Sequence, residues 1–109
     1  MINVKVSRKA GHIQSVELTG HAGFAEHGKD IVCAAVSALA IHTVNALIEV
    51  AHLDISVEVD QVEGGYLAFA MPILTRQEQE KADLLLNSFV LSLSQIKEEH
   101  NQYIQIKEN

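Results

Sequence analysis

The longest apolar tract of the chain runs from Ile31 to Ala51, and it limits the folds that the sequence can adopt. The tract is nearly long enough to cross a bilayer, but five polar or charged side chains interrupt it and would be costly in lipid: Ser37, His42, Thr43, Asn45 and Glu49. Its many alanines favour helix and allow neighbouring elements to approach closely. We therefore expect a helix that other elements cover, and no membrane span.

Apolar and polar residues alternate on both sides of this tract, and that alternation predicts strands. The expected strands cover residues 2–6, 16–18, 55–59, 66–71 and 102–107. Turns at residues 10–12 and 63–65 would make two hairpins, and the last strand would lie at a sheet edge.

A second helix is expected after Thr75, where Glu78 completes a capping-box pattern. Apolar residues then recur at three- and four-residue intervals over 82–96, which gives one wide apolar face. The order is β-β-α-β-β-α-β in a single domain over residues 1–109. The fold class is α+β, with two helices packed on a mainly antiparallel sheet.

The charge of the chain restricts its partners. The formal net charge is −6, and the eight Lys and Arg residues are scattered, so we expect no direct nucleic-acid binding. A basic protein or peptide suits such a field better. One cysteine makes no intramolecular disulfide, and the N-terminus lacks a signal-peptide pattern, which indicates a cytoplasmic protein.

That cysteine, Cys33, lies where a loop rich in glycine and histidine meets the apolar tract. Asp30 is a good N-cap for a helix that begins at Ile31, which would place Cys33 in the first turn. Unpaired amides there would favour a thiolate, and His21, at the end of the preceding strand, is the candidate partner. The residues alone leave a buried structural cysteine open.

Three further features bear on this candidate site. His21, His27 and Cys33 follow the spacing H-x5-H-x5-C, but structural zinc sites generally have four ligands, so we expect no metal and no cofactor. Ser37 lies one helical turn after Cys33, in a supporting position. Gly23 and Gly28 would give the loop the conformational freedom of a lid over a bound substrate.

Two motifs resemble the bacterial ribosomal-processing cysteine proteases (Prp): Gly20-His21-Ala22, and D-I-V-C-A-A-V-S over residues 30–37. The resemblance covers essentially the whole chain. It implies a cysteine endopeptidase that removes the N-terminal extension of the large-subunit ribosomal protein L twenty-seven during ribosome biogenesis. It also implies a homodimer, and a loop that orders around the peptide.

The resemblance assigns catalytic roles to two residues. Cys33 would be the nucleophile that forms a thioester acyl-enzyme, and His21 its catalytic histidine. Asp30 and Ser37 would shape the loop and the helix start. The alternative is a non-enzymatic dimeric module that binds a ribosomal protein or an assembly factor, with Cys33 structural.

Overall fold

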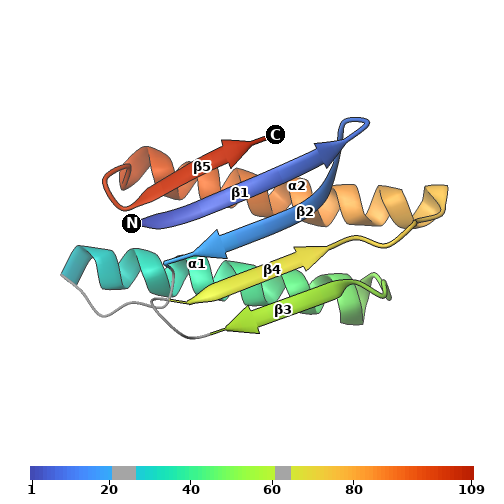
Figure 1. The fold of residues 1–109 in the computed structure, drawn as a ribbon, viewed down its shortest axis with the longest axis horizontal. Coiled ribbons are helices and arrows are strands. Elements are labelled where there is room, and N and C mark those ends of the chain that lie inside the picture. Colours follow the sequence, from blue (N-terminus) through green and yellow to red (C-terminus); the bar gives the residue numbers. More distant parts are fainter. Residues whose placement is uncertain (21–26, 61–64) are drawn as a thin grey trace.

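The computed structural model describes residues 1–20, 27–60 and 65–109, with residues 27–30 described as backbone only. Figure 1 shows the elements in chain order: β1 (Ile2–Lys9), β2 (His12–Thr19), α1 (His27–Asn45), η1 (Ala46–Val50, a π-helical turn), β3 (Ser56–Asp60), β4 (Tyr66–Ala70), α2 (Arg76–Glu99) and β5 (Ile104–Glu108). The predicted β-β-α-β-β-α-β order and α+β class are confirmed.

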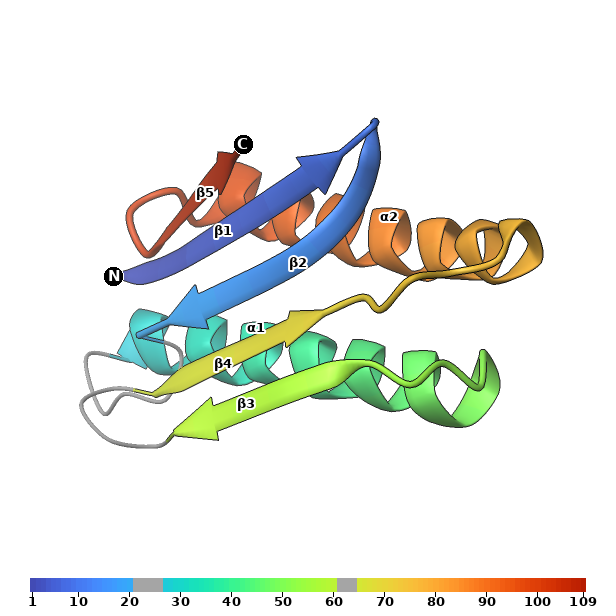
Figure 2. The ribbon, with the colours of Figure 1, turned by 45° about the vertical axis from the view of Figure 1, so that its right-hand side comes forward.

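The five strands form one mixed sheet in the order β3-β4-β2-β1-β5. Neighbouring strands are antiparallel except for β1 and β5, which run parallel. Both helices lie against the same face of the sheet, as Figures 1 and 2 show from two directions, and the other face is open. The expected position of the last strand at a sheet edge is confirmed.

The core lies between the sheet and the helices. Every second residue of β1 points into it, so Ile2, Val4 and Val6 are all buried. Phe69 of β4 meets Phe89 of α2 with ring centroids 6.1 Å apart, which ties the middle of the sheet to the second helix.

Helix α2 begins as the sequence predicts. The Thr75 side chain accepts a hydrogen bond from the Glu78 amide at 3.2 Å, and the Glu78 carboxylate accepts one from the Thr75 amide at 2.9 Å. Hydrogen bonding of the Glu78 carboxylate to the Thr75 backbone amide, and then to the Thr75 side chain, lowers the pKa of Glu78.

The predicted start of α1 is wrong. The helix begins at His27, so Asp30 is its fourth residue and not its N-cap, and Gly28 belongs to the helix rather than to a loop. An acidic residue is favourable anywhere in the first turn, where it faces the positive end of the helix dipole. Asp30 therefore marks the beginning of the helix without fixing its first residue.

The expectation that other elements cover the apolar helix is met on one side only. Val32, Val36 and Ala40 are fully buried against the core, but Ile31 and Ile41 are 54% and 57% exposed. Among the elements that the structure describes, none lies against the outer side of α1, because both helices pack on one face of the sheet. The stretch 31–50 could span a membrane by length and composition, but core helices of soluble proteins pass the same test, and 44% of it is buried here.

Candidate active site

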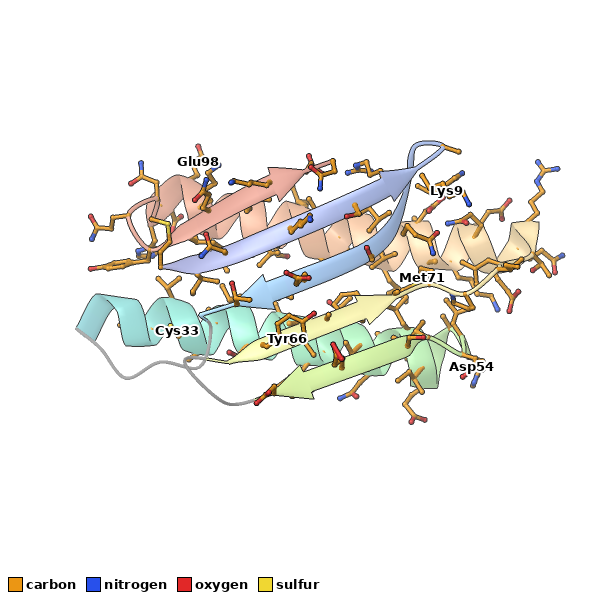
Figure 3. All side chains as sticks on the ribbon, viewed as in Figure 1. Lys9, Cys33, Asp54, Tyr66, Met71 and Glu98 are labelled. Atoms are coloured by element: carbon orange, nitrogen blue, oxygen red, sulfur yellow. The ribbon has the colours of Figure 1, made fainter. Side chains whose placement is uncertain are left out.

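Cys33 lies on α1 near the end of the sheet at which β2 finishes (Figure 3). Its side chain is buried, with 4% of the residue exposed. The Cys33 thiol donates a hydrogen bond to the carbonyl oxygen of Gly20, with 3.8 Å between sulfur and oxygen. A thiol that donates this hydrogen bond keeps its proton, so attack on a carbonyl requires a base that removes that proton.

Gly20 is held by the ends of three chain segments. Its φ is +80°, a conformation that side chains with a Cβ rarely adopt. A Cβ at this position would lie 2.5 Å from the Met1 carbonyl oxygen, and the Gly20 amide donates to the Gly65 carbonyl at 3.3 Å. The start of β1, the end of β2 and the start of β4 therefore converge beside the thiol.

His21 directly follows Gly20 in the sequence, so Cys33 contacts the residue that precedes the predicted catalytic histidine. His21 and Gly23 themselves lie outside the described residues. The predicted pairing of His21 with Cys33 and the predicted loop role of Gly23 thus stay predictions.

The argument from the helix start does not hold for Cys33. Cys33 is the seventh residue of α1, past the first four amides that lack a partner within the helix. The effect of the helix dipole is concentrated in the first turn. Activation of the thiol at this position therefore depends on a partner side chain rather than on the helix terminus. Ser37, predicted to support the site, is half-buried one turn further along.

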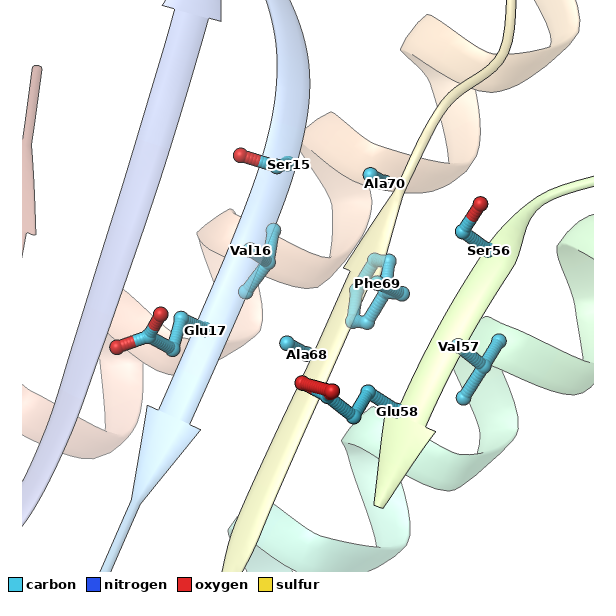
Figure 4. A pocket seen from close by; sticks show the side chains of 9 residues that line it. All are labelled: Ser15, Val16, Glu17, Ser56, Val57, Glu58, Ala68, Phe69 and Ala70. Carbon is cyan, nitrogen blue, oxygen red and sulfur yellow. The ribbon is translucent and has the colours of Figure 1, made fainter.

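A groove on the open face of the sheet is a second feature of the molecule, and sequence reasoning missed it. It has a volume of about 410 Å³ and follows β4 (Figure 4). Ala68 and Ala70 line its middle, because each is small and points away from the helices. The strand register places Ala68 between two carboxylates, Glu17 on β2 and Glu58 on β3. Alternation predicts which face of the sheet each side chain points to, but it does not predict which strands are neighbours. The groove is therefore visible only once the order of the strands is known.

Tyr66 begins β4 next to this groove. Its hydroxyl donates a hydrogen bond to the Glu17 carboxylate at 3.4 Å. Desolvation raises the pKa of Tyr66, and the neighbouring charges of Glu17 and Glu58 raise it further. The groove is therefore acidic, and Cys33 is not among the residues that line it.

The described part of the chain contains no group of three or more His, Cys, Asp or Glu residues placed to hold a metal ion. The zinc alternative rests on His21 as well as His27 and Cys33, and His21 is not among the residues described. No cofactor is needed for the thiol chemistry that the site offers.

The chain is similar to proteins of known activity. The family model described as cysteine protease Prp matches residues 1–105. The ribosomal processing cysteine protease Prp of Bacillus subtilis is 38% identical over 98 residues, which cover 89% of this chain and 87% of that protein.

Solved structures agree with this match. The crystal structure of SMU.848 from Streptococcus mutans superposes with a TM-score of 0.92 at 40% identity, covering 99% of this chain and 93% of that one. Prp from S. aureus, described as an essential ribosomal processing protease in complex with a substrate peptide, has a TM-score of 0.81 at 29% identity over the full length of both chains.

These similarities decide between a cysteine-type peptidase and a non-enzymatic binding module. Burial of the thiol alone would suit a structural cysteine in a binding module. A match to cysteine peptidases over residues 1–105 favours the enzyme, and the role of Cys33 as its nucleophile stays a prediction. The chain belongs to the cysteine protease Prp family and is a cysteine-type peptidase.

Proposed function

We propose that this protein is a cytoplasmic endopeptidase that removes the N-terminal extension of the large-subunit ribosomal protein L twenty-seven, with Cys33 as nucleophile and His21 as base. The observation that carries the proposal is the contact between the Cys33 thiol and the Gly20 carbonyl, immediately before His21 in the chain. The substrate is supported by the similarity to proteases named for ribosomal processing.

The chemistry starts from a buried thiol, whose proton must be removed for the sulfur to attack. His21 takes the proton of the Cys33 thiol as the sulfur attacks the scissile carbonyl carbon, and then gives that proton to the leaving amine. The carbonyl carbon stays bound to sulfur as a thioester. Water activated by His21 hydrolyses the thioester, which releases the peptide acid and restores the thiol.

Access to the thiol sets a condition on this reaction. With 4% of Cys33 exposed, the described structure leaves little room for a carbonyl to reach the sulfur. The proposal therefore requires that the bound peptide displace the thiol's present contact with the Gly20 carbonyl. A substrate peptide should accordingly change the rate at which a small alkylating reagent modifies Cys33.

A cleavage assay tests the proposal, and it is the first prediction. A peptide that spans the extension and the start of the mature ribosomal protein is incubated with the wild type, Cys33→Ala and His21→Ala. We expect cleavage at one bond by the wild type, no cleavage by Cys33→Ala, and a kcat lowered by about 10²–10⁴-fold in His21→Ala. Acid-quenched wild-type samples should contain the protein with the acyl fragment attached.

Circular dichroism of both variants separates loss of chemistry from loss of fold. Cleavage by folded Cys33→Ala would rule out Cys33 as the nucleophile. If the wild type leaves this peptide intact but cleaves another sequence, the assignment of the substrate is wrong while the peptidase stands.

A further inference from the structure

The open face of the sheet carries a row of side chains that crosses all five strands. The strand pairing places them side by side from β3 to β5 in the order Glu58, Ala68, Glu17, Lys5 and Lys107. The row is therefore acidic over β3, β4 and β2 and basic over β1 and β5. The groove of about 410 Å³ lies over the acidic end, and we call it the acidic groove.

The two carboxylates of the acidic groove, Glu17 and Glu58, have no cationic partner in the described part of the chain. The ion pairs found there belong to other acidic residues: Glu108, Asp83 and Glu80. Lys5 is the cross-strand neighbour of Glu17, but it is not in any of these pairs. The protein's own cations therefore leave the negative charge of the groove available to a ligand.

Both carboxylates lie near a single hydroxyl, that of Tyr66. This hydroxyl donates to Glu17 at 3.4 Å. Desolvation raises the pKa of Tyr66 most, and Glu17 and Glu58 raise it further through their charges and through hydrogen bonds. A neutral tyrosine has one proton to donate, whereas the two carboxylates and the hydroxyl oxygen together offer several acceptor sites. The acidic groove therefore has more hydrogen-bond acceptors than the protein's own donor can use.

The middle of the acidic groove has room for a cation because its floor is made of small residues. Ala68 and Ala70 point to the open face and have no side-chain atoms beyond Cβ. Figure 4 shows the Glu58 side chain reaching from β3 over β4 toward Ala68. A lysine ammonium carries three N–H donors and an arginine guanidinium five, and neither is an acceptor. Such a group matches a site that consists of acceptors.

We propose that the acidic groove binds a lysine or arginine side chain of the protein substrate, in a segment separate from the one that is cleaved. The cationic group donates charged hydrogen bonds to Glu58 and Glu17, and the Tyr66 hydroxyl oxygen is a further acceptor. Cys33 does not line the groove. Gly20, whose carbonyl the thiol contacts, follows Glu17 by three residues, which is about 10 Å along an extended strand. The groove is therefore a second contact with the substrate, apart from the scissile bond.

Charge complementarity identifies the kind of segment that the groove takes. The proposal rests on the proposed function in one respect, namely that the substrate is a ribosomal protein. Proteins that bind nucleic acid carry Lys and Arg for their phosphate contacts, and the net charge of −6 attracts such a protein. Lys5 and Lys107 repel cations from β1 and β5, so the basic segment is confined to the acidic half of the face.

Other occupants fit the acidic groove less well. The residues that the structure describes contain no group of three or more His, Cys, Asp or Glu placed to hold a metal ion. A nucleic acid would bring phosphates next to the two carboxylates, and like charges repel. A cationic side chain of a protein meets neither objection.

A binding experiment tests the proposal without cleavage. Cys33→Ala protein is titrated with a short blocked peptide in which arginine alternates with alanine, at about 0.05 M sodium chloride, by isothermal titration calorimetry. We expect Glu17→Gln with Glu58→Gln to raise the Kd about 5-fold. The matched control is Glu80→Gln with Glu98→Gln, which removes the same charge from α2, behind the sheet, and should leave the Kd nearly unchanged. Equal changes for the two double variants would overturn the proposal, and so would a Glu17 and Glu58 variant that altered the sedimentation mass of the protein alone, since a second copy would then occupy the face.

A substitution with the opposite sign sharpens this test. Lys5 lies next to Glu17 in the row and opposes a cation bound there, so Lys5→Gln should lower the Kd of the arginine peptide about 2-fold. Lys97→Gln is the matched control, because Lys97 is exposed on α2 and its loss changes the net charge equally. Equal tightening by both variants would show that only the net charge acts, which would contradict a site in the groove.

Cleavage kinetics separate this proposal from the proposed function. With an active protein, Glu17→Gln with Glu58→Gln should raise the KM of a ribosomal peptide that keeps its basic segment and leave kcat unchanged. A peptide cut down to the scissile segment should have the same KM with both proteins. If the wild type cleaves both peptides and the double variant alters neither KM, the groove proposal fails and the protease assignment stands. If the wild type binds the arginine peptide through the groove but cleaves no ribosomal peptide, the proposed function fails and the groove remains a binding site for cationic side chains.

Discussion

Gly20 is the residue on which the geometry around the thiol depends. It adopts a positive φ, it has no space for a Cβ beside the Met1 carbonyl, and its own carbonyl accepts the Cys33 hydrogen bond. The structure therefore explains why the first position of the G-H-A motif is a glycine, which the motif alone does not reveal. This glycine lets the first residue of the chain, the end of β2 and Cys33 meet at one point.

Gly20→Ala should destabilise the fold and slow acylation. The left-handed conformation costs a residue with a Cβ about 1–2 kcal/mol, and forcing atoms into occupied space adds about 1–3 kcal/mol. Gly11→Ala is the matched control, since Gly11 has a φ of +83° but nothing within 4 Å of the added Cβ. Urea denaturation should show a larger loss of unfolding free energy for Gly20→Ala, and equal losses would contradict the close approach to Met1.

At the scale of single elements, the start of α2 gives a pH-dependent contribution whose sign can be derived. Its capping hydrogen bonds lower the pKa of Glu78 in the folded protein from an ordinary value of 4.5. The carboxylate therefore stabilises the fold above pH 4.5, and this stabilisation is lost as the pH falls through the lowered folded value.

Glu78→Gln should thus lower the free energy of unfolding by a constant amount between about pH 6 and 8, with the difference shrinking below pH 4.5. Glu80→Gln is the control, because Glu80 lies on the same helix and its ion pair with Arg76, at 3.8 Å, is exposed to solvent. Chemical denaturation across this pH range measures both variants. A difference for Glu78→Gln that persists unchanged to pH 3 would exclude the carboxylate as its source.

The two helices also show how well local sequence patterns predict where a helix begins. Thr75 and Glu78 predicted the start of α2 correctly, because a capping box is made by residues three apart. Asp30 misplaced the start of α1, because an acidic residue suits several positions of the first turn. The placement of Cys33 within the first turn of α1 was wrong for the same reason, and its role as nucleophile, which the family motif implies, stays a prediction.

At the scale of the whole molecule, the order of the strands in the sheet could not be predicted from the sequence. Residues 2–6 pair with residues 104–108 in parallel, across almost the full length of the chain. Alternation predicts which side chains of a strand share a face, but it holds no information on such distant neighbours. The acidic groove and the uncovered side of α1 both depend on the order of the strands and on the placement of both helices on one face. Neither was therefore predictable from periodicity.

The net charge of −6 leads to the last prediction, which concerns the approach of the substrate. An acidic enzyme attracts a basic peptide through long-range electrostatic interactions, which salt screens. The net charge should therefore affect mainly the rate at which enzyme and peptide associate. For a peptide with Lys and Arg beside the scissile bond, we expect kcat/KM to fall several-fold between about 0.05 and 0.5 M sodium chloride, with little change in kcat.

A peptide of the same cleavage sequence with neutral flanking residues is the control, and its kcat/KM should hardly respond to salt. Glu17→Gln with Glu58→Gln separates the groove from the overall charge, since both carboxylates line it. If the double variant loses the salt dependence, the open face of the sheet is where basic flanks are attracted. If it keeps the dependence, the attraction comes from the field of the whole protein. A salt response equal for basic and neutral peptides would contradict steering altogether, because ions that only perturb the protein act on both substrates alike.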